Sequence, residues 1–141
     1  MSKNYWLFKS EPDCWSWQEQ LAKGAVGEEW SGVRNYEARN NMLKMRLGDE
    51  GFFYHSNKEK AIVGIVKICK TAHQDSTIDD IRWQCVDVAA VRSLTRAVTL
   101  KEIKSHPDLQ NIALIKRSRL SVAPINAVEW EIINQIANQA S

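Results

Sequence analysis

Short apolar runs along the chain predict β-strands. Each run is rich in branched or aromatic residues, and a turn-like or polar stretch follows it. The runs occupy residues 5–9, 51–55, 61–69, 82–94 and 120–122. The fourth run has polar interruptions at Asp87 and Arg92, and Pro124 is expected to end the last strand.

Polar residues at fixed spacing predict where helices begin. Three pairs have the capping-box spacing, in which a side chain and a glutamate three positions later satisfy each other's backbone donors: Ser16 with Glu19, Thr99 with Glu102, and Asn126 with Glu129. Asn35 can cap a further helix. The predicted helices cover residues 17–23, 36–45, 99–105 and 126–137.

The second of these helices has a weak apolar stripe. Met42 and Met45 are expected to face the core, with Leu43 and Leu47 beside them. Gly48 follows, beyond the expected end of the helix.

The order of the elements predicts the fold class. The three central strands follow one another without helices between them, whereas a doubly wound parallel sheet needs helical crossovers. We therefore predict an α+β protein, with a mostly antiparallel sheet or small curved barrel and flanking helices. Since no linker or repeat interrupts the 141 residues, one domain over residues 1–141 is expected.

The composition is that of an ordinary globular protein, with 44% hydrophobic and 26% charged residues. Neither a transmembrane run nor a signal-peptide core is present in the sequence, so we expect no membrane and a cytoplasmic location, or a nuclear one in a eukaryote. The three cysteines are far apart and lack CxxC spacing. We expect reduced thiols, no metal and no cofactor.

Charge and tryptophan content point weakly toward an anionic partner. The net charge is only +2, but basic residues cluster at 34–46 and at 116–119. Six tryptophans are many for this length. We assign Trp6, Trp83 and Trp130 to packing, whereas Trp15, Trp17 and Trp30 lie in or near predicted loops, where at least one could be a ligand platform.

No catalytic pattern is evident. His55 and Ser56 are neighbours on a predicted strand, so their side chains point to opposite faces. Cys14 has no histidine nearby in sequence, and known hydrolase, metalloprotease and deaminase motifs are missing from the sequence. A non-enzymatic protein is therefore expected.

The stretch EEWSGVRNYEARNN instead carries groups suited to binding. Trp30 offers a flat ring, Asn35 and Asn40 offer donor and acceptor amides, and Arg34 and Arg39 offer forked donors. The alternatives are structural: Asn35 as a helix cap, Ser56 as a turn residue, or Arg39 paired with Glu37.

Two predicted strands end in polar side chains. One ends in Lys9, Ser10 and Glu11, and the other in His55-Ser56-Asn57. If these ends lie side by side, a polar pocket forms beside Trp30.

Four motifs in order, YWLFKSEP, W-SGVRNYEARNN, GFFYHSN and RLSVAPI followed by EW, make the chain similar to the EVE domain family. That family is PUA-like and related to the YTH domain, and the resemblance spans Tyr5 to about Ile136. It implies a small curved barrel and a pocket for a single base, with modified bases in nucleic acid as ligands. Glu37 departs from an expected glutamine, Glu50-Gly51 stands where apolar residues are expected, and the 56–64 loop is short.

The resemblance implies a set of site residues. It comprises Lys9, Ser10, Glu11, Trp30, Val33, Arg34, Asn35, Tyr36, Arg39, Asn40, His55, Ser56, Asn57, Arg119 and Ser121. Trp30 would stack on the base. The base edge would contact Asn35, Ser56 and Asn57, and phosphate or sugar would contact Lys9, Arg34, Arg39 and Arg119.

The leading hypothesis is a non-enzymatic reader of a methylated or hydroxymethylated base in DNA or RNA. A second is a pocket for a free nucleoside or nucleotide, in which Lys116, Arg117 and Arg119 would not matter. A third is an enzyme acting on a modified base, with Glu11 or His55 as proton carrier. The sequence does not indicate an oligomeric state.

Overall fold

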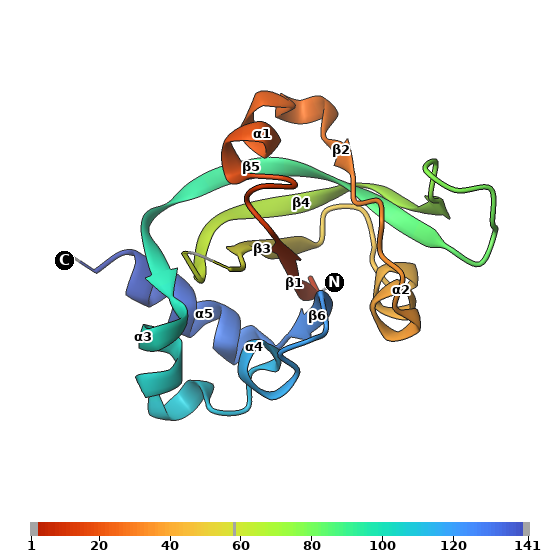
Figure 1. Ribbon diagram of the computed structural model, residues 1–141. Coiled ribbons are helices and arrows are strands. Elements are labelled where there is room, and N and C mark those ends of the chain that lie inside the picture. Colours follow the sequence, from red (N-terminus) through yellow and green to blue (C-terminus); the bar gives the residue numbers. More distant parts are fainter. Residues whose placement is uncertain (1–2, 58, 140–141) are drawn as a thin grey trace.

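The computed structural model describes residues 3–57 and 59–139 (Figure 1). Its strands are β1 (Tyr5–Ser10), β2 (Glu28–Glu29), β3 (Glu50–His55), β4 (Ala61–Gln74), β5 (Gln84–Thr99) and β6 (Val122–Ile125). Its α-helices are α1 (Trp17–Ala22), α2 (Tyr36–Leu43), α3 (Leu100–Ser105), α4 (Ala113–Lys116) and α5 (Ala127–Ala137). Short 3₁₀ helices, η1 (Gly24–Val26) and η2 (Pro107–Leu109), connect some of them.

The strands form one open, six-stranded sheet in the order β2-β5-β4-β3-β1-β6. The β1–β3 pair is parallel and the other neighbouring pairs are antiparallel. This confirms the predicted α+β class and the mostly antiparallel pairing. Within the described residues the sheet does not close, because β2 and β6 lie at its two edges.

The central strands are covered on both faces. Consecutive residues of a strand point to opposite faces, yet Leu7 and Phe8 on β1 and Phe52 and Phe53 on β3 are all fully buried. In Figure 1, α3, α4 and α5 gather at one side of the sheet, while α2 lies near the opposite end of β5. The core therefore surrounds β1 and β3, and the recess described below opens beside the end of β1.

The β4–β5 hairpin is longer than predicted. β4 continues to Gln74 and β5 to Thr99, and their pairing contains four register shifts. Such irregularities bend strands and increase their twist, which suits the long curved hairpin in Figure 1. The added residues are mostly polar, and cross-strand pairing rather than apolar pattern keeps them extended.

The predicted helix starts are confirmed, including all three capping boxes and the Asn35 cap. Met42 and Met45 are buried as expected, but Leu43 and Leu47 are 48% and 66% exposed, so the expectation for them was wrong. The helix α2 ends two residues earlier than predicted, which leaves only a narrow buried stripe.

Two further differences concern the sheet edges. The two-residue strand β2 was not predicted, because its identity as a strand depends on pairing with Asp87 and Val88 of β5. The last strand runs through Pro124 rather than ending before it. β6 is an edge strand, where a missing backbone donor can face away from the sheet.

Candidate functional site

The two polar strand ends lie side by side, which was the condition for a polar pocket beside Trp30. The parallel β1–β3 register pairs Ser10 with His55, and the backbone N–H of Ser56 donates to the Ser10 carbonyl at 2.9 Å. The chain then leaves β1 through Glu11 and enters α1, whereas β3 turns back into β4. The two strand ends therefore lie next to each other, but the chain continues from them into different elements.

A recess of about 530 Å³ opens beside the β1 end, and we call it the main recess. It is lined by Lys9, Ser10, Glu11, Cys14, Trp15, Glu28, Glu29, Trp30, Ser31, Gly32, Val33, Arg34 and Ser121. Seven of the residues implied by the motifs are among them: Lys9, Ser10, Glu11, Trp30, Val33, Arg34 and Ser121.

Trp30 is a fixed wall of the main recess. Trp30 is only 7% exposed, and its ring makes edge contacts with Phe8 and Phe53 at centroid distances of 5.1 and 5.6 Å. Its backbone N–H donates to Val86 O at 2.8 Å. The tryptophan that looked exposed in the sequence is therefore part of the core as well as of the recess.

Asp75 holds the loop that follows Trp30. Its buried carboxylate accepts hydrogen bonds from the Gly32 N–H at 2.8 Å and from Arg34 Nη1 at 3.1 Å, and also from the backbone and hydroxyl of Thr77. Burial works against the charge, but the bonds from Thr77, Gly32 and Arg34 outweigh it and lower the pKa of Asp75 to about 2. Sequence reasoning missed this residue, because Gly32 and Arg34, its partners in the loop, lie more than 40 positions away.

Lys9 links the main recess to a second, basic recess. Its Nζ donates to the carbonyl oxygens of Arg117 and Ser118, both at 3.1 Å, just after α4. Burial lowers the pKa of Lys9. The side chain therefore joins β1 to the basic segment while it lines the main recess.

The basic recess has a volume of about 280 Å³ and is lined by Asn35, Lys116, Arg117, Ser118, Arg119 and Leu120. Arg117 forms a bidentate ion pair with Glu37 of α2, one contact being 2.7 Å. Within the described residues, Lys116 and Arg119 form no ion pair. The Glu37 departure from the family motif thus neutralises Arg117 and leaves two cations of the predicted cluster.

Asn35 belongs to this basic recess rather than to the main one. Its Oδ1 caps α2 by accepting the Ala38 N–H at 2.9 Å, which is the structural alternative considered for it. The expectation that Asn35 lines the pocket beside Trp30 is therefore corrected.

The remaining α2 residues of the motif lie on an exposed stack. Tyr36, which is 50% exposed, stacks on Trp83 with centroids 4.9 Å apart, and the guanidinium of Arg39 lies over the Tyr36 ring. Arg39 also donates to Asn40 Oδ1 and to the carbonyl of Arg82, not to Glu37. Trp83 precedes β5 and is half-buried, so it serves packing as assigned, but it packs on Tyr36 outside the core.

The end of β3 does not line the main recess. His55 is buried: its Nε2 accepts the Trp17 N–H at 2.9 Å, and its Nδ1 lies 2.9 Å from Glu59 Oε1. Asn57 has a left-handed backbone with φ of 74°, which asparagine tolerates in turns. His55 therefore holds the start of α1 inside the protein, and Ser56 and Asn57 lead into the turn after β3. None of the three lines the main recess, contrary to expectation.

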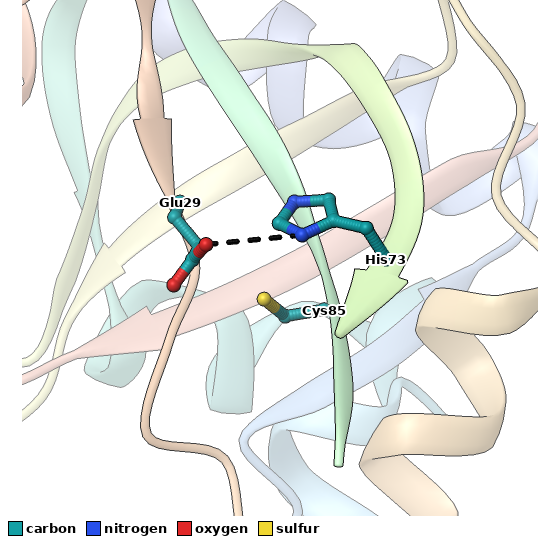
Figure 2. A group of neighbouring side chains, drawn as sticks. All are labelled: Glu29, His73 and Cys85. Atoms are coloured by element: carbon teal, nitrogen blue, oxygen red, sulfur yellow. Dashed lines mark ion pairs between the residues drawn. The ribbon is translucent and has the colours of Figure 1, made fainter. Parts of the chain in front are cut away.

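Glu29, which also lines the main recess, forms a cluster with His73 and Cys85 in which the ligand atoms lie within 4.8 Å of one another (Figure 2). Nδ1 of His73 lies 2.9 Å from the Gln74 carbonyl and Nε2 lies 2.7 Å from Asp87 Oδ1, so both nitrogens face acceptors, as an imidazolium requires. Burial alone would lower the pKa of His73, but the hydrogen bonds to Asp87 and Gln74 and the charges of Asp87 and Glu29 raise it.

This cluster suits a charged network better than a metal centre. Burial, and then the charges of Glu29, Asp75 and Asp87, raise the pKa of the Cys85 thiol to about 12, so the thiol is protonated within this network. A metal would also have to displace an acceptor from His73. The Glu29 carboxylate, in contrast, already accepts hydrogen bonds from Ser76 N and Oγ at 3.1 and 2.7 Å and lies 3.8 Å from His73 Nδ1.

The fold and the site together define a small α+β binding domain with a polar, tryptophan-walled recess. The model of the EVE domain family matches residues 4–136, and the chain belongs to this family. In the part of the chain that the structure describes, the helices are too short or too polar to span a membrane.

Relatives extend over nearly the whole chain. Mouse thymocyte nuclear protein 1 is 38% identical, with the alignment covering 92% of this chain and 72% of that protein. Protein Atu2648 from Agrobacterium tumefaciens is similar in structure, with a TM-score of 0.95 and 50% identity over 98% of this chain and 95% of that one. Human THYN1, solved in complex with DNA containing 5-methylcytosine, gives a TM-score of 0.93 and 34% identity over 99% of this chain and 100% of that one.

A more distant likeness concerns the fold alone. The YTH domain of Zygosaccharomyces rouxii MRB1, solved with N6-methyladenosine RNA, has a TM-score of 0.57 at 16% identity. The likeness confirms the predicted α+β fold, whereas the sheet of the described residues stays open and does not close into the predicted small barrel.

Proposed function

We propose that this protein is a non-enzymatic nucleic-acid-binding module that holds a modified base, methylated or hydroxymethylated, in the main recess. The observation that carries the proposal is the similarity over the whole chain to human THYN1, which was solved with DNA containing 5-methylcytosine. The main recess supports it, since it is large enough for a small ligand and has an aromatic wall.

The rigidity of Trp30 favours a role in stacking. Base–aromatic stacking contributes about 1–3 kcal/mol, and a ring already fixed by Phe8 and Phe53 loses little entropy on binding. A base inside a duplex must first leave the stack, which costs a few kcal/mol. We therefore expect single-stranded or weakly paired sites to bind more tightly than a perfect duplex.

Phosphate contacts are available beside the main recess. Lys116 and Arg119 line the adjoining basic recess, and Lys9 connects the two. On α2, Arg39 adds a cation without a carboxylate partner among the described residues. A polymer that spans both recesses would use these cations, whereas a free nucleoside would not.

The test is a fluorescence-polarisation panel of short oligonucleotides, DNA and RNA, single- and double-stranded, each plain or with one modified base. Trp30 is too deeply packed for an alanine variant to be informative, so the main recess is blocked by Ser121→Leu, with Ser105→Leu on α3 as the matched control. We expect Ser121→Leu to weaken binding of the modified oligonucleotide at least roughly tenfold and Ser105→Leu to leave it unchanged. Equal binding by both variants would show that no base enters the main recess.

A second pair of variants separates a polymer from a small-molecule ligand. The double variant Lys116→Gln/Arg119→Gln should weaken plain and modified oligonucleotides alike and reduce the slope of log affinity against log salt by about 1.4–1.8. Binding of the free modified nucleoside should not change. If the double variant binds the oligonucleotides as tightly as wild type does, the basic recess is not a phosphate site.

The enzyme alternative now depends on Glu11, because both ring nitrogens of His55 have protein partners outside the main recess. Glu11 lies exposed at the recess edge. Product analysis by mass spectrometry after long incubation with the modified oligonucleotide tests it, and we expect unchanged substrate. The cytoplasmic location stays a prediction.

A further inference from the structure

Three cations line the basic recess, and they differ in their partners. Arg117 donates from Nη1 and Nη2 to the two carboxylate oxygens of Glu37, the first contact being 2.7 Å. Among the described residues, Lys116 and Arg119 form no ion pair. Glu37 lies in the first turn of α2, two positions after Asn35, which lines the same recess. One of the three charges that an anion could meet is therefore already bound by the protein itself.

The ion pair between Glu37 and Arg117 has the geometry that Arg117 would use for a phosphate. A guanidinium binds carboxylates and phosphates alike through two parallel N–H groups. The hydrogen bonds from Arg117 lower the pKa of Glu37, so its carboxylate is charged at neutral pH. The N–H groups that face Glu37 cannot serve a phosphate at the same time.

This ion pair lies at the surface. The side chains of Arg117 and Glu37 are 51% and 48% exposed. Ion pairs this exposed contribute little to stability, because water and salt screen the charges and two side chains must be held in one geometry. Neutralising either residue should therefore leave the protein folded.

The backbone of Arg117, in contrast, is fixed. Its N–H donates to the Ala113 carbonyl at 2.7 Å, and its carbonyl accepts the Leu120 N–H at 3.0 Å and a hydrogen bond from Lys9 Nζ at 3.1 Å. Release of the guanidinium from Glu37 thus needs rotation of the Arg117 side chain alone. The released side chain remains at the basic recess, which Arg117 lines.

We propose that Glu37 competes with nucleic-acid phosphate for Arg117 and thereby limits the affinity of the basic recess. While the ion pair is closed, a polymer uses Lys116 and Arg119. When the carboxylate is removed, Arg117 becomes a third phosphate contact beside them. This inference rests on the proposed function and adds to it the residue that sets the strength of the phosphate site.

The test is Glu37→Gln, which keeps the size of the side chain and removes its charge. At about 50 mM salt this variant should bind plain and modified single-stranded oligonucleotides alike roughly three- to tenfold more tightly than wild type. The slope of log affinity against log salt should become steeper by about 0.7, the value for one added phosphate contact on a single strand. Polarisation titrations over a series of salt concentrations measure both quantities.

Two further variants show where the gain in affinity comes from. Glu37→Gln/Arg117→Gln has the net charge of wild type and should return the affinity and the salt slope to their wild-type values. Glu131→Gln on α5 is the matched control, since Glu131 is exposed, loses the same charge and lines neither recess. It should change the affinity by less than about twofold. Urea unfolding confirms that each variant is folded.

The outcomes distinguish this inference from the proposed function. Unchanged affinity and salt slope in Glu37→Gln overturn the competition, and the proposed function still stands if Lys116→Gln/Arg119→Gln weakens binding. A gain that persists in Glu37→Gln/Arg117→Gln comes from the loss of the carboxylate alone and overturns the role of Arg117. An equal gain in Glu131→Gln shows a general effect of net charge and overturns the inference as well. Failure of every oligonucleotide to bind overturns the proposed function itself.

Discussion

Two polar strand ends meet at one place in this protein and serve different purposes. Lys9-Ser10-Glu11 ends β1, and His55-Ser56-Asn57 ends the parallel neighbour β3. Both were expected to line a pocket. Only the β1 end does so, while the β3 end is engaged in contacts within the protein.

The difference follows from what each strand leads into. After β1 the chain runs outward into the Glu11–Trp15 turn, so its polar groups border open space. After β3 it turns back at once into β4, and His55 lies beneath the start of α1, where the Trp17 N–H needs an acceptor. Motif residues of similar polarity therefore differ in role according to whether a neighbouring backbone group already uses them.

The largest expected effect comes from removing the internal support. His55→Ala leaves the buried Trp17 N–H without its acceptor and removes a ring packed on Phe53, so we expect a loss of about 2–4 kcal/mol in the free energy of unfolding. Urea unfolding followed by tryptophan fluorescence measures it. His55→Gln is the control, because its amide oxygen can reach the position of Nε2 and should recover part of the loss.

If both variants are as stable as wild type, the hydrogen bond to Trp17 contributes nothing to stability and the contrast between the two strand ends fails.

The variant Lys9→Ala tests the same comparison at the end of β1. Its carbonyl partners lie at the surface, so we expect a loss of about 1 kcal/mol or less.

The next largest effect is on the pH dependence of the free energy of unfolding. It comes from Asp75, which holds the loop that forms one wall of the main recess. Asp75 has a folded-state pKa of about 2, below its ordinary value of 3.8, so its charge stabilises the folded protein. The contribution is fully present above about pH 4 and is lost as the pH falls through 2. It amounts to about 2 kcal/mol.

Asp75→Asn tests this assignment. Wild type and variant are unfolded in urea between pH 2 and pH 7, and the difference between their unfolding free energies should shrink by about 2 kcal/mol toward the acid end. Other carboxylates titrate in both proteins and cancel in the difference. A difference independent of pH would mean that the Asp75 charge does not hold Gly32 and Arg34.

Much of the fold was predictable because its signals are local. The capping boxes of Ser16, Thr99 and Asn126 place three helix starts correctly from residues three positions apart. The missed features depend on distant partners. β2 exists through pairing with β5, and the outer halves of β4 and β5 are held by each other rather than by an apolar pattern.

The candidate site divides in the same way. The motif residues Trp30 and Arg34 were found because a binding loop concentrates rings and cations in one stretch of sequence, and Lys9 was found because it lies at the polar end of a predicted strand. Glu29 lines the main recess but was not among the residues predicted from the sequence, and Asp75 carries no local signal of its contact with Gly32. Sequence alone gives the types of residue present, but not which of their hydrogen-bonding groups remain free.

The smallest expected effect lies at the tip of the β3–β4 turn. Asn57 has φ of 74°, a conformation that glycine adopts without strain and asparagine with little. Asn57→Gly should therefore change the unfolding free energy by less than about 0.5 kcal/mol, whereas Asn57→Ala should cost about 1 kcal/mol.

Neither variant should alter oligonucleotide binding, because Asn57 does not line the main recess. Polarisation titrations with the modified oligonucleotide measure this alongside the unfolding experiments. A loss of affinity in the stable Asn57→Gly variant would return the β3 end to the binding surface, since only a contact of the amide with the ligand could produce it. Unchanged affinity in both variants would instead leave Asn57 as a turn residue, with its backbone conformation as the reason for its presence.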